Sequence, residues 1–365
     1  MGSPPRTAWP DDLLLDELSL RARREVVQAL DSASLWPAQS RASLISGDQR
    51  ARGRSFIDRE MRDWLGSDDF RWIHSESVFG RSNHRFRARL PMLVGYGHEL
   101  GAGLHSWLGC PLSTRGAAMS LGATFNLGIV LFDLVCDGVP GGASRIAKVL
   151  DGPLLRLLFV DPEAGNGLLA REEVADGPEL RILFKAVVRF FELVRAHATT
   201  REDLSALADA LELAFRAQLD TANPQTCSVA AVESKSVLPF TIMLRSIRAC
   251  CKPEALTAAD HAEEIARIMG RVFWLVDDLA DLCKDLGEGA VNGVLMRVAA
   301  PGSATGTAAR RLLESQTLAE VASEVRDQLA KLIKAIAPTR ARMDGGWPFE
   351  EWLLVSIRGW IAPSP

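Results

Sequence analysis

The sequence predicts an all-α protein organised as a single domain over residues 1–365. Apolar residues return at three- and four-residue spacing through most of the chain, which is typical of amphipathic helices. No useful length shows the two-residue alternation of a half-buried strand, and there is no short-period repeat. Clusters of Gly and Pro, such as Gly138–Gly142, separate the periodic stretches. A chain of this length could form one large domain or two, and the continuous helical pattern favours one bundle of about ten or more helices.

The first eighty residues contain the weakest helical pattern. Leucines and valines between Leu13 and Val27 predict an amphipathic opening helix. Residues 36–55 are polar and broken, and we expect a loop there. A short helix is expected over 56–65, and residues 66–84 are again expected to be irregular. We treat residues 1–50 as an N-terminal extension.

Two long helices are predicted next. From Arg87 to Trp107 the apolar residues are helically spaced, and the helix is expected to end near Gly109. Thr114 to Asp137 is apolar and rich in small residues. It is followed by Gly138–Gly142, a strong stop signal.

The second half of the chain is predicted as further helices joined by loops. Residues 161–177 are expected to form a loop with one short turn. A helix over 257–286 begins with Thr257 to Asp260 as a capping region. The other helices are expected at 144–158, 178–198, 202–219, 227–251, 291–298, 308–314, 318–336 and 349–360.

Composition narrows the class of protein. A content of 47% hydrophobic and 24% charged residues is ordinary for a soluble globular chain, and a net charge of −4 gives no electrostatic footprint for nucleic acid. Six scattered cysteines without a CxxC motif indicate reduced thiols in a cytoplasmic protein. The first ten residues lack the plan of a signal peptide. No window reaches eighteen uninterrupted apolar residues, so no membrane span is predicted.

The most informative stretch runs from Phe273 to Asp285, where four aspartates fall within nine residues after an apolar run. On a helix, Asp277, Asp281 and Asp285 recur every fourth residue and share one face. Like charges on one stripe destabilise a helix unless a cation holds them, and Mg²⁺ takes such oxygen ligands together with a phosphate-bearing substrate. The alternative is a solvated acidic face. Because apolar residues flank the acids, we favour a helix that lines a cavity.

A second acidic pair, Asp133 and Asp137, lies at the C-terminal end of the helix predicted over 114–137. The helix dipole opposes negative charge at that end, so the pair is costly unless a positive group compensates. The two acidic motifs, at positions 133 and 277, are 144 residues apart. On two long helices they could face each other across a bundle and bind metal ions from both sides.

Four motifs, taken together, resemble those of a known superfamily. Residues 273–281 resemble an FQxxDDxxD motif, and residues 133–137 resemble DDxxD with leucine at its second aspartate. Lys235-Ser236 resembles a Lys-Thr pair whose lysine contacts a diphosphate. Residues 87–91, followed by 99–101, are a degraded form of the segment GKRxRP…E.LG. These are the motifs of the isoprenoid synthase superfamily, which includes the trans-isoprenyl diphosphate synthases and the class I terpene cyclases.

The resemblance covers about residues 85–290, within a core that we place at about 85–300. It implies a helical bundle with a central apolar cavity, a prenyl diphosphate as small-molecule substrate, Mg²⁺ (three ions with bound diphosphate) and, by family precedent, a homodimer. The acids of the second motif also match the spacing of the cyclase motif NDxxSxxxE. The implied metal ligands are Asp133, Asp137, Asp277, Asp281 and Asp285. The implied catalytic residues are Asp133, Asp137, Lys235 and Asp277, and the implied substrate-binding residues are Arg89, Arg145, Lys235, Lys284, Trp274 and Gly128.

Departures from the synthase pattern favour a cyclase that releases diphosphate from an allylic donor. Synthases hold a second diphosphate with basic residues, but Ala88 and Leu90 stand where two arginines would, and Arg145 stands alone where the family has a pair. Trp274 replaces a glutamine, and an aromatic face can stabilise a carbocation.

The expected substrate is a C15 or C20 prenyl diphosphate, or a longer one. Gly128 stands where the family uses bulky side chains to limit tail length, and we expect Gly122, Ala123 and Gly128 to line the pocket. Two alternatives stay open: a prenyl diphosphate synthase that uses isopentenyl diphosphate, and a non-catalytic partner subunit of such a synthase.

Overall fold

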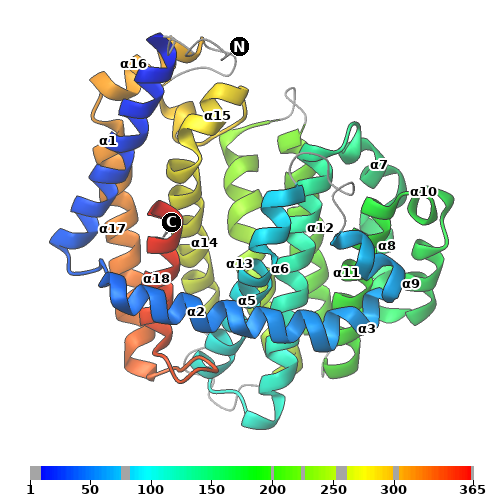
Figure 1. The fold of residues 1–365 in the computed structure, drawn as a ribbon. Coiled ribbons are helices and arrows are strands. Elements are labelled where there is room, and N and C mark those ends of the chain that lie inside the picture. The colour runs from blue at the N-terminus through cyan, green and yellow to red at the C-terminus, as the bar shows by residue number, and fades with distance from the viewer. Residues whose placement is uncertain are drawn as a thin grey trace, which may run out of the picture.

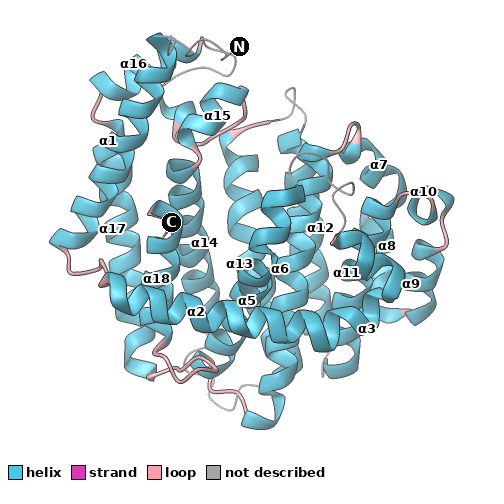
Figure 2. Cartoon of the chain, in the orientation of Figure 1, coloured by secondary structure: helices cyan, strands magenta, loops and turns pink. Residues whose placement is uncertain are grey.

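The computed structural model describes residues 10–74, 83–198, 201–222, 227–251, 261–298 and 304–362. Within these ranges the chain is helical (Figure 2), and the one pairing of extended residues is an isolated bridge between Arg342 and Pro348. The prediction of an all-α fold is therefore confirmed.

The helices follow one another with short connections. In the first half they are α1 (Pro10–Ser32), α2 (Gln39–Phe56) with a π-helical turn (Ile57–Met61), α3 (Arg62–Leu65), α4 (Ser67–Ile73), α5 (Asn83–Trp107), α6 (Arg115–Gly138), α7 (Gly142–Val149), α8 (Gly152–Val160), α9 (Pro162–Leu169) and α10 (Glu172–Ala175). In the second half they are α11 (Pro178–His197), α12 (Arg201–Ala222), α13 (Val229–Cys251), α14 (Ala262–Ala280), α15 (Leu282–Glu288), α16 (Thr305–Glu314), α17 (Thr317–Ile336) and α18 (Phe349–Ile361).

The long helices stand side by side, and α2 crosses in front of them (Figure 1). Helix α6 packs against α5, α11 and α13, and α13 packs in turn against α12 and α14. On the other side of α14 lie α17 and α18, while α1 packs along α16 and α17. The order α6, α13, α14 matters for the site, because these helices carry the first acidic pair, Lys235 and the second acidic motif.

The loop predicted over residues 36–55 is wrong, because helix α2 forms there. Its sequence is rich in Arg, Ser and Gly, which hid the helical period. One narrow face is nonetheless buried at helical spacing and includes Ala42, Ile45, Gln49 and Phe56. Tertiary packing against α5 thus decides the structure of a segment whose own pattern is weak.

Other boundaries also differ from the prediction. The loop expected over 161–177 contains α9 and α10, and the single helix expected over 144–158 is divided into α7 and α8. Part of the irregular stretch 66–84 is helix α4. Only a 3₁₀ turn, Leu295–Arg297, forms in the helix expected over 291–298. The expected capping region Thr257 to Asp260 lies outside the described residues.

Helices α5 and α6 meet backbone to backbone. A Cβ added at Gly97 would lie 2.3 Å from the carbonyl oxygen of Gly122, and one added at Gly122 would lie 2.1 Å from that of Gly97. Only glycine permits this approach. Gly122 therefore belongs to a helix contact and, contrary to the prediction, does not line a pocket; Ala123 is fully buried.

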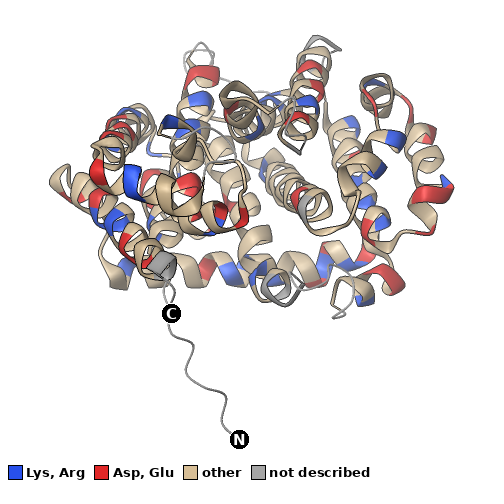
Figure 3. Ribbon diagram, turned by 90° about the horizontal axis from the view of Figure 1, so that it is seen from above, with Lys and Arg blue, Asp and Glu red and all other residues tan. Residues whose placement is uncertain are grey.

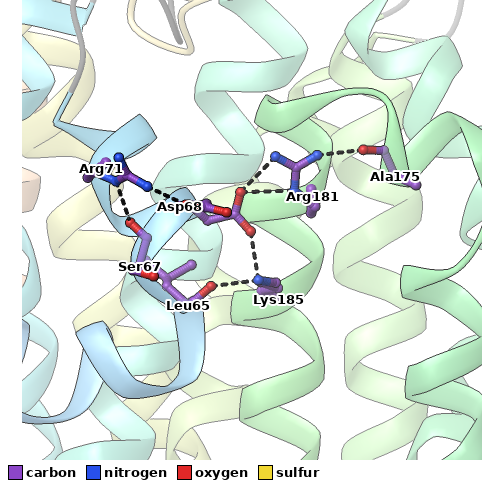
Figure 4. Close-up of polar contacts among 8 residues, drawn as sticks. Leu65, Ser67, Asp68, Arg71, Ala175, Arg181 and Lys185 are labelled. Atoms are coloured by element: carbon purple, nitrogen blue, oxygen red, sulfur yellow. Dashed lines mark hydrogen bonds and ion pairs between the residues drawn. The ribbon is translucent and has the colours of Figure 1, made fainter.

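A buried ion cluster joins α4 to α11 (Figure 4). Asp69, which is 3% exposed, lies 2.8 Å from Arg181 Nη2 and 2.6 Å from Lys185 Nζ. Lys185 also donates to the carbonyl oxygen of Leu65. Burial opposes ionisation of Asp69, but the hydrogen bonds from Arg181 and Lys185 outweigh it and lower the pKa of its carboxyl.

An aromatic cluster forms between α5, α13, α14 and α18. The ring centroid of Tyr96, the only tyrosine of the chain, lies 5.7 Å from that of Phe273 and 6.1 Å from that of Trp360. Phe240 stacks on Phe273 at 5.2 Å. The hydroxyl of Tyr96 is buried without a hydrogen-bond partner among the described residues, and burial raises its pKa well above the usual value.

Charges of both signs are interspersed over the outer helices (Figure 3).

Among the described residues, one helical stretch, Leu112–Cys136, is long and apolar enough to cross a membrane by length and composition. It contains most of α6, whose packing against α5, α11 and α13 is that of a core helix.

Candidate functional site

The second acidic motif lies on two helices instead of one. Helix α14 ends at Ala280, Asp281 has φ −94° and ψ 3°, and α15 begins at Leu282 and leaves the axis of α14 (Figure 1). Backbone bonds still span the break, since Asp281 N donates to Asp277 O and Asp285 N to Asp281 O, each at 2.8 Å. The predicted helix over 257–286 is thus interrupted at its middle acid, but the acids remain within electrostatic reach of one another.

Asp277 combines an exposed side chain with a strongly raised pKa. The side chain is exposed to water, yet neighbouring protein atoms surround its carboxyl group. This burial, followed by the negative charges of Asp281, Asp133 and Asp285, raises the pKa of Asp277 to about 7. Asp133 on α6 is thus close enough to Asp277 on α14 for their charges to interact.

Asp133 is held by two residues from two further helices. Its Oδ1 lies 3.2 Å from Lys235 Nζ on α13 and also accepts a hydrogen bond from Gln218 Nε2 on α12. The positive charge of Lys235 also lowers the pKa of Asp277, against the larger effects that raise it. Lys235 thus pairs with Asp133 of α6 and acts by charge on Asp277 of α14.

The structure does not bring every predicted residue to this place. Arg145 pairs with Glu179 of α11 at 2.6 Å, and Arg89 is exposed on α5. Lys284, in contrast, lies within the motif, exposed and 3.5 Å from Asp281. The side chain of Asp137 lies outside the described part of the structure.

Two predicted pocket residues have different environments. Trp274 is only 4% exposed, and its ring lies with the carboxylate of Asp278 against Gly293, so it packs in the core beside the helix break. Gly128, in contrast, is half-buried, and a Cβ added there would meet nothing within 4 Å.

Sequence reasoning missed two polar residues beside the acids. Gln218 lies in an ordinary amphipathic stretch, and Asn292 lies in a short loop after α15. Asn292 is 1% exposed and donates to Asp285 Oδ2 at 2.9 Å. Neither Gln218 nor Asn292 stands in a motif, and the burial of Asn292 is visible only in the structure.

Among the described residues, no three Asp, Glu, His or Cys side chains come together as a ready-formed metal-binding group. The acids of α6, α14 and α15 interact by charge but do not converge on a single point. Magnesium sites of the substrate-sharing kind use one or two carboxylates, with waters and phosphate oxygens as the other ligands. The donor set is compatible with that kind of site.

Comparisons with known proteins do not assign the chain to a family. No protein-family model matches it, and a search of curated proteins gave no match.

Proposed function

We propose that this protein is a class I terpene synthase that ionises a prenyl diphosphate with Mg²⁺ and releases diphosphate. The observation that carries the proposal is that Lys235 lies 3.2 Å from Asp133 and also acts by charge on Asp277, although the two acids are 144 residues apart in sequence. A solvated acidic face would not explain why distant acids gather around one lysine while repulsion and burial raise the pKa of Asp277 to about 7.

The acids fit a divalent cation by charge and by donor type. Asp133, Asp277, Asp281 and Asp285 supply only hard oxygen ligands, and their mutual repulsion would be relieved by a bound cation. Asp137 extends this set on the sequence pattern alone. When bound, Mg²⁺ would act as a Lewis acid on diphosphate oxygens and offset the negative charge of the leaving group.

The protein's own residues would complete the charge balance. Lys235 supplies a fixed positive charge between the two acidic helices, and Gln218 holds Asp133 in place. Phe273 lies one helical turn before Asp277, so the aromatic cluster with Tyr96 and Phe240 begins directly beside the acids. These rings pack against one another, and Phe273 is 2% exposed, so the cluster gives the acids an apolar, water-poor flank.

The arginines favour a cyclase over a chain-elongating synthase. A synthase must bind a second diphosphate, which requires cationic side chains that are free to reach it. Arg145, which stands alone where the family has a pair, is already paired with Glu179. A second charged substrate would therefore lack this binding group.

The test is a product assay on the purified protein. C10, C15 and C20 allylic diphosphates are incubated with Mg²⁺, with and without isopentenyl diphosphate, and with EDTA as the metal-free control. We expect metal-dependent diphosphate release and a hydrocarbon or alcohol product without isopentenyl diphosphate. Linear, chain-extended diphosphates would favour the synthase, and activity only with a second protein would favour the partner subunit.

A further inference from the structure

A buried asparagine ties the two halves of the second acidic motif together. After α15 the chain turns at Gly289 (φ +67°) and returns over the break between α14 and α15. Asn292 Nδ2 donates to the carbonyl oxygen of Asp278 on α14 at 2.7 Å and to Asp285 Oδ2 on α15 at 2.9 Å. One side-chain amide therefore joins both helices.

The orientation of this amide is fixed. Asn292 Oδ1 accepts from Val294 N at 3.0 Å and from Leu295 N at 3.2 Å, so the oxygen must face the 3₁₀ turn and the NH₂ group must face the acids. Both amide hydrogens and both acceptor positions are then used. With 1% exposure, the side chain has no room to rotate away.

Asp278 takes part in the same attachment. Its Oδ2 accepts from Gly293 N at 2.8 Å, and it is 8% exposed. A Cβ at Gly293 would lie 2.6 Å from Trp274 Cζ2 and 2.8 Å from this Oδ2, so only glycine allows the backbone to approach. Asp278 therefore anchors the loop, whereas its neighbour Asp277 interacts with Asp133.

We propose that Asn292 is a positioning residue that orients the Asp285 carboxylate for a divalent cation, and that Asp278 belongs to this anchor and not to the ligand set. The inference rests on the proposed function. With Oδ2 held by Asn292, Asp285 keeps its Oδ1 for a cation, and its direction is set relative to Asp277 across the helix break. Without Asn292, α15 would keep its helix but Asp285 would lose the contact that aims it.

Binding of Mg²⁺ with inorganic pyrophosphate, measured by titration calorimetry, tests this without turnover. Asn292→Ser keeps a hydroxyl that can accept from Val294 N but cannot reach both helices, and Asn292→Ala removes the side chain. We expect affinity to fall by at least about tenfold in both, the usual size of an outer-ligand effect. Asn166→Ser is the matched control, because Asn166 makes an exposed bond to Glu163 at 3.1 Å; its affinity should equal that of the wild type.

A double-mutant cycle with Asp285→Asn separates positioning from general damage to the fold. If Asn292 acts through Asp285, Asn292→Ser should have no further effect on affinity in the Asp285→Asn background. Circular dichroism melting confirms that each variant is folded at the assay temperature. Equal losses in both backgrounds would overturn the inference.

Failure of the inference and failure of the proposed function give different results. If Asp285→Asn weakens binding but Asn292→Ser and Asn292→Ala bind like the wild type, only the positioning role is wrong. If the wild-type protein does not bind Mg²⁺ with pyrophosphate, the proposed function is wrong and the role of Asn292 falls with it.

Discussion

Lys235 Nζ lies 3.2 Å from Asp133 Oδ1, and this pair joins α13 to α6 at the place where the charge of Lys235 also acts on Asp277 of α14. Both side chains of the pair are partly exposed, at 28% and 39%, so the pair itself contributes at most about 1 kcal/mol to stability. The pair matters because it holds the positive charge of Lys235 near two carboxylates that would otherwise repel each other.

Replacing Lys235 should therefore affect chemistry more than folding. We expect Lys235→Met to lower the rate of diphosphate release by about 10²–10³-fold, the usual effect of removing one charge-stabilising group from an active site. The thermal midpoint should change little. The matched control is Lys148→Met on α7; a similar loss of rate in that variant would mean that the effect of Lys235 is not local.

Replacing Asp277 should separate stability from activity. In metal-free buffer at pH 8, Asp277→Asn removes a carboxylate whose charge is opposed by burial and by Asp281, Asp133 and Asp285. Because water screens the exposed side chain, we expect a gain in unfolding free energy on the order of 1 kcal/mol. Diphosphate release should be lost. Urea unfolding and the product assay measure the two effects, with exposed Asp63→Asn as control; a destabilised Asp277→Asn protein would contradict the account of the site.

How much of this site the sequence could predict depends on the kind of information that each residue carries. Asp133, Asp277 and Lys235 stand in spaced motifs on strongly periodic helices, and the structure places them together. Gln218 and Asn292 carry no such signal, because a polar side chain is recognisable as a partner only once its acid is located. The break at Asp281 was also hidden, since a four-residue spacing fits a continuous helix as well as two helices with preserved backbone bonds.

The helices also divide into those that the sequence predicts and those that it does not. Strong apolar periodicity predicted α5, α6, α11 and α17 to within a few residues. Helix α2 could not be predicted in this way, because its helical structure depends on burial of a narrow face against α5, and its surface residues are polar.

The ion cluster of α4 and α11 predicts acid sensitivity. Asp69→Asn leaves Arg181 and Lys185 without their buried partner and should cost about 3–5 kcal/mol at pH 7. Because the pKa of Asp69 is lowered on folding, its contribution is present above the unfolded-state pKa of about 3.9 and is lost as the pH falls through the folded-state pKa.

The difference in unfolding free energy between wild type and Asp69→Asn should thus shrink below about pH 4. Urea unfolding at pH 7 and pH 3 measures it. Asp68→Asn is the adjacent control, since Asp68 and Arg71 are 82% and 78% exposed and their pair should contribute less than about 1 kcal/mol. Equal losses in the two variants would contradict a special role for Asp69.

Replacing glycine by alanine should have opposite effects on the stability of the protein at two positions of α6. Gly128→Ala meets nothing within 4 Å and should stabilise the protein by about 0.5–1 kcal/mol, because alanine favours a helix interior over glycine. Gly122→Ala places a methyl group 2.1 Å from the Gly97 carbonyl oxygen and should cost about 1–3 kcal/mol. Thermal unfolding of both variants measures the two effects. A Gly122→Ala protein as stable as the wild type would mean that α5 and α6 separate easily.

A larger side chain at Gly128 should select among substrates. If the tail lies along this face of α6, Gly128→Phe should reduce turnover of a C20 diphosphate at least about tenfold relative to a C10 diphosphate, since the ring fills space that the longer tail needs. Gly116→Phe, at an exposed glycine of the same helix, should leave the ratio unchanged. Equal losses for both chain lengths would place the tail elsewhere.

Tyr96 gives this chain a natural spectroscopic reporter. Its phenol is the only one in the protein, it lies against Phe273 one turn before Asp277, and its raised pKa keeps it un-ionised at neutral pH. The chain also has nine tryptophans that absorb in the same region, but the tyrosinate absorbance that appears at alkaline pH comes from Tyr96 alone. Because the phenol is buried, its ionisation requires the aromatic cluster between α5, α14 and α18 to open, and that opening can be followed in the unmodified protein.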